Sequence, residues 1–432
     1  MADRPVKDRR RRRPRTEGAW PNPQPGQQVV LHTRVVTDTG GGPDKTIFYS
    51  APFLAHTNYW LAAAYMHPPR DPGFAALRAR AEKARCPLIS VPDAGPLDRH
   101  VVQKLLRICR RYNVAIWHGH DYKSNMLGLM LRPFWPMKLV TTLHGWVKET
   151  NRTPLYYAID RWCLPYYHHV IAVSDDLVEQ AVKVGVKPEN CTLLLNGIDE
   201  QTFVRSGPAA ESPLRREMGT PAGRLVIGGM GRLSPEKAFN NLIYATQRLL
   251  QQGLDVELWI AGDGDSRPDL QRLIDHHKLG DPRGQARIRL LGFCNDTIAF
   301  YEALDMFVLS SLREGLPNVV LEAMSMSLPV VSTAVAGVPK LISDGESGLL
   351  CPIGDIDALA APMHRLATDP ALRDRLAAAA RATIEQRFTF RQRMAREKAI
   401  YDLVLGKASQ IESAQAGAPA PSPLPGVGRG LG

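Results

Sequence analysis

The chain of 432 residues lacks any apolar run near the roughly 18 residues that a helix needs to cross a bilayer. Arginines near its start are not followed by the apolar segment of a secretory signal. Cysteine is scarce, since only six are present, none at metal-ligand spacing and none in a Cys-x-x-Cys pair. These absences argue against a disulfide framework and a structural zinc site. We therefore expect a reduced, cytoplasmic protein that neither spans a membrane nor is secreted.

Acidic residues are in deficit, and the deficit lies in the first half of the chain. The net charge is +11, and residues 1–205 hold 29 lysines and arginines against 18 acidic residues, whereas residues 206–432 hold 25 of each kind. Part of the excess lies in an arm at 1–26 that is too charged and proline-interrupted to fold. The rest lies on two basic amphipathic helices predicted at 77–85 and 101–112, which suit solvent or an anionic surface such as phospholipid headgroups or nucleic acid.

Short apolar runs alternate with helical segments along most of the chain, a pattern typical of parallel sheets wound with helices. Strands are predicted in the first half at 29–36, 88–91, 114–117, 139–143, 170–173 and 192–195, and in the second half at 225–230, 256–261, 288–291, 306–309 and 330–333. One sheet does not accommodate both sets. We predict domains at 27–205 and 206–389, then a helix at 390–408 that returns to the first domain and a disordered tail at 409–432.

The most informative stretch is EGLPNVVLE at 314–322, which sets two carboxylates around a predicted helix start. Gly315 allows a tight turn, and Pro317 suits the first helical position, where its missing N–H has no cost. The backbone N–H groups at 318–320 would then point outward without partners. A helix start carries about half a positive charge, so these groups would attract a phosphate.

The two carboxylates of this stretch, Glu314 and Glu322, indicate what else the ligand carries. A phosphate repels a carboxylate, so both side chains suit hydroxyl groups better. A ligand with phosphates and with hydroxyls on both sides of them is a nucleotide sugar. Glutamates also flank helix starts for structural reasons alone, but this stretch follows a predicted strand, at the sheet edge where open parallel sheets bind ligands.

Two cations and a glycine pair occupy comparable positions after other strands. Arg232 and Lys237 follow the strand at 225–230, and both would reach a diphosphate, with each charge-assisted bond contributing about 1.5–3 kcal/mol. An exposed loop with ordinary surface charges is the alternative. Gly41 and Gly42 follow the first strand, where the absence of side chains permits close approach of a phosphate or sugar.

Three histidines lie at predicted strand ends of the first half: His118, His120 and His144. The His-x-His pair is a weak zinc signal, because no further cluster completes a site, and the DGD turn at 263–265 is an equally weak signal for a metal-bound diphosphate. We predict no metal. Hydrogen bonding to sugar hydroxyls or phosphate is favoured instead, with His118, His120 and Lys123 as candidate contacts for an acceptor.

In their order and spacing these motifs resemble the retaining GT-B glycosyltransferases of the "glycosyl transferases group 1" superfamily, which includes glycogen synthases. The resemblance covers roughly residues 29–390. It is carried by GGPDK at 41–45, HG at 144–145, AVS at 172–174, NGID at 196–199, GRLSPEK at 231–237, AGDG at 261–264 and EGLPNVVLEA at 314–323. It implies an α/β fold of the GT-B type, with two facing Rossmann-like doubly wound domains and a cleft between them.

The resemblance also implies a role for each motif residue in binding a nucleotide-diphosphate sugar. Arg232 and Lys237 would bind the diphosphate, and backbone N–H groups of Asn318 and Val319 the distal phosphate. Glu322 would bind the ribose, and Glu314 hydroxyls of the transferred sugar. His144 would lie beside the reacting sugar, and Gly41, Gly42 and Gly231 would complete the donor site. Such enzymes retain the anomeric configuration without a protein nucleophile and generally need no metal or other cofactor. One departure is Ala238, where the family commonly has glycine after the lysine.

The leading interpretation is transfer of a sugar from a nucleotide-diphosphate donor to a lipid-linked or polysaccharide acceptor. The second domain would bind the donor and the basic first domain the acceptor, with the inner face of the membrane as a candidate location. Two alternatives stay open. One is an anion-binding or nucleic-acid-binding protein with a vestigial sugar site, although no aromatic-basic RNA motif is present and we expect no nucleic-acid partner. The other is a nucleotide-sugar epimerase on the same fold.

Overall fold

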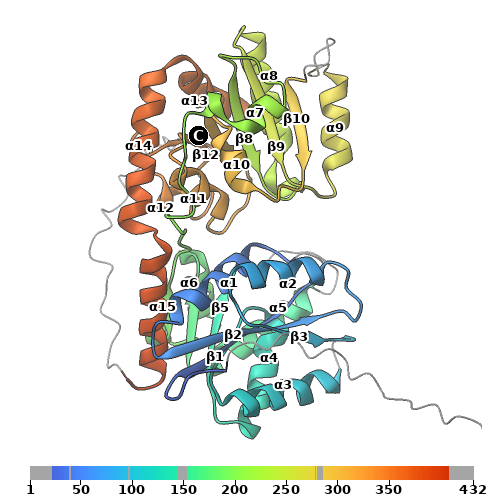
Figure 1. The fold of residues 1–432 in the computed structure, drawn as a ribbon, viewed down its shortest axis with the longest axis vertical. Coiled ribbons are helices and arrows are strands. Elements are labelled where there is room, and N and C mark those ends of the chain that lie inside the picture. The colour runs from blue at the N-terminus through green and yellow to red at the C-terminus, as the bar shows by residue number, and fades with distance from the viewer. Residues whose placement is uncertain are drawn as a thin grey trace, which may run out of the picture.

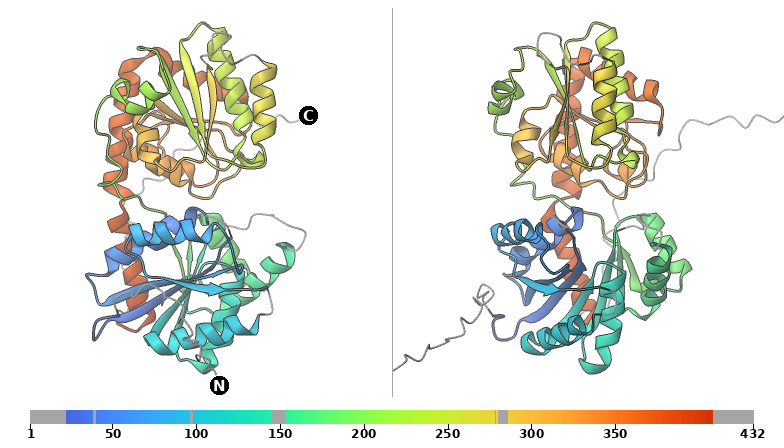
Figure 2. Two further views of the ribbon diagram at one scale, coloured as in Figure 1. Left: turned by 45° about the vertical axis from the view of Figure 1, so that its right-hand side comes forward. Right: turned by 90° about the vertical axis from the view of Figure 1, so that its right-hand side faces the viewer.

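A computed structural model describes residues 22–37, 40–95, 98–144, 153–277, 279 and 286–407. It contains two parallel sheets, one in each half of an elongated molecule, and helices cover both faces of each sheet (Figures 1 and 2). The prediction of two doubly wound domains is confirmed. The predicted arm at 1–26 lies largely, and the predicted tail at 409–432 wholly, outside the described residues. Within the described ranges, no helix is both long and apolar enough to cross a membrane.

The first sheet has seven parallel strands in the order β3-β2-β1-β4-β5-β6-β7. They are β1 (Gln28–Val35), β2 (Tyr59–His67), β3 (Leu88–Pro92), β4 (Val114–Gly119), β5 (Lys138–Leu143), β6 (His169–Ala172) and β7 (Cys191–Leu193). The sequence analysis missed β2. All nine of its residues are buried, so it shows no alternation of polar and apolar side chains, and its three central alanines are poor strand formers.

The helices of the first half are α1 (Gly42–Leu54), α2 (Phe74–Lys83), α3 (Arg99–Tyr112), α4 (Tyr122–Leu131), α5 (Thr153–Cys163) and α6 (Asp175–Lys183). The predicted amphipathic character of α3 is confirmed. Its apolar stripe of Val101, Leu105, Ile108 and Cys109 is buried against the sheet, whereas Arg107, Arg110 and Arg111 are exposed. The side chain of Asp98 caps the helix start, and Asn113 ends the helix in the left-handed conformation.

The second sheet has six parallel strands in the order β10-β9-β8-β11-β12-β13. They are β8 (Leu225–Met230), β9 (Val256–Ala261), β10 (Ile288–Gly292), β11 (Met306–Leu309), β12 (Val330–Thr333) and β13 (Leu349–Cys351), of which only the three-residue β13 was not predicted. The surrounding helices are α7 (Pro213–Glu217), α8 (Phe239–Gln251), α9 (Arg267–His276), α10 (Thr297–Glu302), α11 (Asn318–Ser325), α12 (Val338–Leu341), α13 (Ile356–Thr368) and α14 (Pro370–Arg387).

The last described helix, α15 (Phe390–Val404), leaves the second half and packs against the first (Figure 1). Its buried side chains Phe390, Met394, Ile400 and Tyr401 belong to the same apolar cluster as residues of β1, β2 and α1. The crossing begins where Ile198 pairs with Thr389 in an isolated bridge. Helix α15 is therefore a structural part of the first half of the molecule.

Candidate functional site

The carboxyl edges of the two sheets face one another. Side-chain contacts link segments that follow strands of the two sheets. They are the Lys45 ammonium to the Glu322 carboxylate at 2.6 Å, the Asn196 amide to the Asn318 side-chain oxygen at 3.0 Å, and an ion pair of Asp175 with Lys340. In each sheet the strand order reverses between neighbours, at β1 and β4 and at β8 and β11. Ligands of open α/β sheets bind at such switch points, so this is the expected location of a site.

The loop after β8 contacts the loop after β11 through two of the predicted site residues. The Lys237 ammonium donates to Oε1 of Glu314 at 2.6 Å, and the Ser311 hydroxyl donates to the same oxygen, also at 2.6 Å. The Ser310 hydroxyl in turn donates to the backbone carbonyl of Lys237 at 3.0 Å. Arg232 lies on the same loop, 59% exposed and 3.1 Å from Glu236. Lys237 and Glu314 thus lie together, and Arg232 marks the outer rim.

Close packing of loops explains why the AGDG motif needs its glycines. Gly262 has φ of 140°, and a Cβ there would lie 1.8 Å from the carbonyl oxygen of Gly231. At Gly264, with φ of 154°, a Cβ would lie 2.5 Å from the carbonyl oxygen of Leu233. Any side chain at either position would push the loop after β9 away from the loop that carries Lys237.

The start of α11 differs in detail from the prediction. Pro317 is the residue before the helix and not its first residue, and Gly315 does not adopt the left-handed conformation. The N–H of Val320 donates to the carbonyl of Pro317 at 3.1 Å. The prediction that this N–H has no partner is therefore wrong. Among the described residues, the N–H groups of Asn318 and Val319 have no acceptor. Two backbone donors, and not three, remain for an anion at this helix start.

Glu322 is almost fully buried at 1% exposure and is held from two sides. Lys45 donates to Oε1, and the Tyr301 hydroxyl donates to Oε2 at 2.9 Å. Burial, reinforced by this carboxylate, raises the pKa of Tyr301 well above its usual value. Sequence analysis did not single out Lys45 as a site residue, although it ends the GGPDK motif and its position was therefore a usable signal.

The glycine pair at the start of α1 lies beside the start of α11. Gly41 precedes the helix with extended backbone, and its N–H donates to the carboxylate of Asp44, which also binds the Arg34 guanidinium. A Cβ on Gly42 would lie 3.7 Å from the side-chain nitrogen of Asn318. The starts of two helices, one from each half of the molecule, therefore lie close together, at a distance that would also accommodate a Cβ at Gly42.

Two predicted acceptor contacts, His118 and Lys123, are committed to the interior of the first half. His118 is fully buried, with its ring nitrogens 2.7 Å from the hydroxyls of Tyr401 and Thr142. Lys123 is buried and pairs with Asp93, and it also donates to the carbonyl of Gly95. Contrary to the expectation, neither side chain is placed to contact an acceptor.

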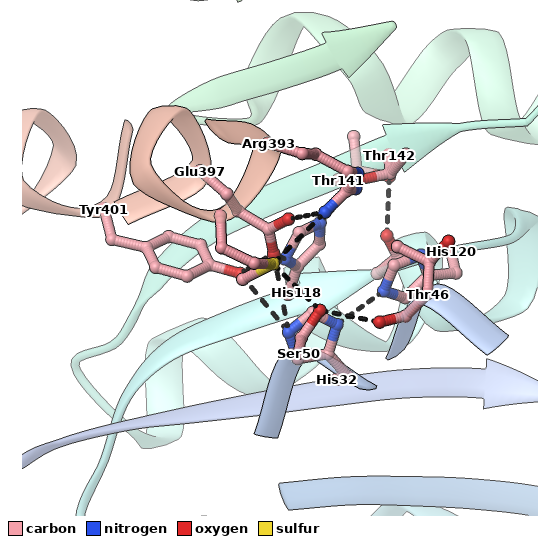
Figure 3. Close-up of polar contacts among 12 residues, drawn as sticks. His32, Thr46, Ser50, His118, His120, Thr141, Thr142, Arg393, Glu397 and Tyr401 are labelled. Atoms are coloured by element: carbon pink, nitrogen blue, oxygen red, sulfur yellow. Dashed lines mark hydrogen bonds and ion pairs between the residues drawn. The ribbon is translucent and has the colours of Figure 1, made fainter. Parts of the chain in front are cut away.

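The other two histidines form a row that begins deeper in the domain. His144 follows β5 and has Nε2 3.0 Å from Nδ1 of His120. Nε2 of His120 lies 2.8 Å from Nδ1 of His32 on β1 (Figure 3). Within the described ranges, His32, His118 and His120 are the one group spaced to hold a metal ion. Every ring nitrogen of these three histidines already makes a hydrogen bond to another side chain, so the group offers no free ligand atom.

Taken together, the fold and these contacts define a two-domain α/β protein of the GT-B type, with the start of α11 between its domains. Sequence comparison agrees for both halves. The family described as "Glycosyltransferase Family 4" matches residues 56–202, and the family described as "Glycosyl transferases group 1" matches residues 224–369.

Individual proteins similar to this chain are glycosyltransferases. The lipopolysaccharide core biosynthesis glycosyltransferase LpsE of Rhizobium meliloti is 39% identical over 176 residues, which span 40% of this chain and about half of LpsE (49%). The proposed glycosyltransferase EpsD of Bacillus subtilis is 30% identical over 297 residues, 67% of this chain and 76% of EpsD. The crystal structure of Anabaena HepE with UDP and glucose matches at a TM-score of 0.73 and 21% identity, covering 87% of this chain and 100% of HepE. The chain belongs to the glycosyl transferases group 1 family.

Ala238, the departure from the family's usual glycine, lies in a strained conformation between Lys237 and α8. Its φ of 46° and ψ of 44° are left-handed values, which disfavour alanine by roughly 1–2 kcal/mol. We expect Ala238→Gly to raise the free energy of unfolding by about 1 kcal/mol, measured by urea denaturation. Ala378→Gly, at an exposed position inside α14, is the matched control and should lower the free energy by about 1 kcal/mol. Destabilisation by both substitutions would contradict the strain at Ala238.

The buried histidines predict a loss of stability in mild acid. Burial lowers the pKa of His32 to about 4 and that of His144 to about 3, from an ordinary value of 6.5. Between about pH 6.5 and 4, the unfolded chain therefore binds protons that the folded rings do not. The free energy of unfolding should fall with falling pH by about 1.4 kcal/mol per pH unit for each such ring.

Urea denaturation at several pH values measures this slope. His168 and His169, whose pKa values burial also lowers to about 4, contribute to the same pH dependence. A substitution at His32 therefore separates the contribution of the histidine row from theirs. In His32→Asn the slope should decrease by about one ring's contribution. An unchanged slope would show that His32 is protonated in the folded protein.

Proposed function

We propose that this protein is a retaining glycosyltransferase that moves a sugar from a nucleotide-diphosphate donor to a lipid-linked or polysaccharide acceptor without a metal ion. Family membership supports sugar transfer, and LpsE supports an acceptor of the lipopolysaccharide type. The printed description of HepE, a complex with UDP and glucose, supports a nucleotide sugar as donor.

The observation that carries the proposal is the meeting of Lys237 and Glu314 beside the start of α11. The site offers an ammonium group and the exposed Arg232 guanidinium on the same loop. It also offers the backbone N–H groups of Asn318 and Val319, which have no acceptor within the part of the chain that the structure describes. These positive groups suit a diphosphate leaving group, whose developing charge they would stabilise. They also provide a way to offset the phosphate charge that needs no metal ion.

Glu314 is better suited to position the sugar than to attack it. One of its oxygens already accepts hydrogen bonds from Lys237 and Ser311, which lowers its nucleophilicity and fixes its orientation. The carboxylate would accept hydrogen bonds from sugar hydroxyls and hold the anomeric carbon beside the departing diphosphate. The acceptor hydroxyl would then enter on the face that the diphosphate leaves, which retains the configuration.

The basic face of the first half supports a membrane-associated acceptor. Arg107, Arg110 and Arg111 line the exposed side of α3. Helix α2, with exposed Arg78 and Lys83, packs on the opposite face of the sheet and is not part of this surface. Juxtaposed basic side chains attract anionic lipid, at about 1 kcal/mol for each charge near the surface. We therefore extend the proposal to a peripheral position on the cytoplasmic face of a membrane.

Nucleotide binding tests the donor site directly. With a chelator present, one of UDP, GDP, ADP or dTDP should raise the melting temperature, because a ligand that binds the folded state stabilises it. Lys237→Ala should abolish this shift and lower turnover about 100- to 1,000-fold with the cognate donor, because it removes charge stabilisation of the leaving group.

Lys183→Ala, which removes an exposed lysine that also pairs with a glutamate, is the control and should behave as wild type. Wild-type turnover in Lys237→Ala would rule out the diphosphate assignment. Conversion of the donor to a second nucleotide sugar, without a glycosylated product, would indicate an epimerase instead.

Membrane association can be tested separately with vesicles. The protein should co-sediment with vesicles containing anionic phospholipid more than with neutral ones, and this preference should weaken as salt rises. Replacing Arg107, Arg110 and Arg111 by glutamine should reduce the bound fraction several-fold while nucleotide binding persists. Equal binding to neutral and anionic vesicles would contradict an electrostatic contact.

A further inference from the structure

A continuous row of hydrogen bonds runs from α15 through the first domain to His144. Glu397 and Tyr401 project from α15 toward His32 and His118, with His120 on the far side (Figure 3). The contacts in order are Tyr401 to Glu397 at 2.6 Å, His32 to Tyr401 at 3.2 Å, His120 to His32 at 2.8 Å and His144 to His120 at 3.0 Å. The donor site as described does not use α15, and α15 contributes the buried end of this row.

The direction of the row is set by Glu397. Its carboxylate is buried and forms an ion pair with Arg393 one turn away. Burial alone would raise its pKa, but neighbouring positive charge, that of the Arg393 guanidinium first, and hydrogen bonds to the carboxylate outweigh burial and leave the pKa below its usual value. An ionised carboxylate only accepts hydrogen bonds, so the Tyr401 hydroxyl must donate to it.

Each further hydrogen bond of the row then has only one possible donor. The Tyr401 oxygen has donated its single hydrogen, so it accepts from Nε2–H of His32 and from Nδ1–H of His118. A neutral imidazole has one N–H, which leaves Nδ1 of His32 as the acceptor for Nε2–H of His120. Nδ1 of His120 then accepts from Nε2–H of His144.

Two further observations agree with neutral rings in this order. Neighbouring rings are stacked or tilted with centroids 4.4 to 5.3 Å apart, too close for adjacent imidazolium cations, and burial lowers the pKa of all four histidines. On the side branch, His118 donates through Nδ1, so its Nε2 accepts from the Thr142 hydroxyl. No donor in the row lacks an acceptor.

We propose that Glu397 and Tyr401 are positioning residues which, through His32 and His120, hold His144 in the tautomer protonated at Nε2, so that its Nδ1 accepts a hydrogen bond from a substrate hydroxyl. His144 follows β5 on the edge that faces the second domain, and its Nδ1 has no hydrogen-bond partner among the described residues. A lone pair at this atom suits an O–H group and repels a phosphate oxygen. The tautomer follows from the hydrogen-bond geometry together with an ionised Glu397 and neutral rings, and the substrate hydroxyl rests on the proposed glycosyltransferase function.

The test is a long-range proton–nitrogen NMR spectrum of the full chain with ¹⁵N-labelled histidine, in which His144→Asn identifies the His144 signals. Wild type should show His144, His120 and His32 protonated at Nε2, and His118 protonated at Nδ1. In Tyr401→Phe, Nε2–H of His32 loses its acceptor, so His144 should shift to a mixture of tautomers or to the Nδ1–H form. His32→Phe interrupts the row at another point and should have the same effect on His144, which covers the case in which Tyr401→Phe does not fold.

Tyr59→Phe is the matched control, because the Tyr59 hydroxyl also donates to a carboxylate of α15, Asp402 at 2.7 Å, but contacts no histidine of the row. It should leave the His144 tautomer unchanged. A wild-type His144 protonated at Nδ1, or an unchanged tautomer in both interrupted variants, would overturn the proposal.

Kinetic measurements then test the positioning role of the row separately from the proposed sugar transfer. Tyr401→Phe should lower kcat about tenfold while the nucleotide affinity stays at its wild-type value, since the row acts on His144 and not on the diphosphate site. Unchanged kcat would overturn the role of the row in orienting His144 for substrate. The expected tautomers in a protein that transfers no sugar to any acceptor would reject the function and leave the row established.

Discussion

Parallel pairing of the strands is the constraint on which the rest of this structure depends. Because every strand of a sheet runs the same way, all of the loops that carry motif residues leave each sheet along one edge. The contact between Lys45 and Glu322 holds the two edges face to face. Cations, helix starts and carboxylates from separate stretches of sequence then lie along the same boundary between the domains.

The crossing helix α15 also carries the groups that would hold a histidine at the domain edge in one tautomer. A buried ion pair such as Arg393 with Glu397 adds little net stability, because desolvation of both groups offsets their attraction. The ion pair instead fixes the direction of the row, because an ionised carboxylate at one end orients every hydrogen bond that follows. The helix that closes the fold thus has a reason to return to the first domain besides covering its apolar face.

Sequence reasoning predicted most of this architecture, and its failures have physical causes. The strands next to glycine-rich loops were found because apolar runs stand out between turns, whereas β2, buried on both faces and rich in alanine, carries no periodic signal. Lys237 and Glu314 were recognisable from local motifs. The commitment of His118 to Tyr401 was not, because these residues are separated by 283 positions and the contact depends on where α15 packs. For the same reason His118 was predicted to contact an acceptor, although it is interior and His32, from another strand, completes the row.

The same logic applies to Glu322, whose neighbours connect donor binding to the contact between domains. A carboxylate has about four acceptor positions, and Lys45 and Tyr301 use one on each oxygen. Acceptor positions therefore remain on Glu322 for a ribose hydroxyl on the proposed function. A ribose bound there would share its carboxylate with a lysine of the opposite domain, so the donor and the first domain would stabilise the same charged group. Contact between the domains would then favour the arrangement in which the donor and His144 face each other.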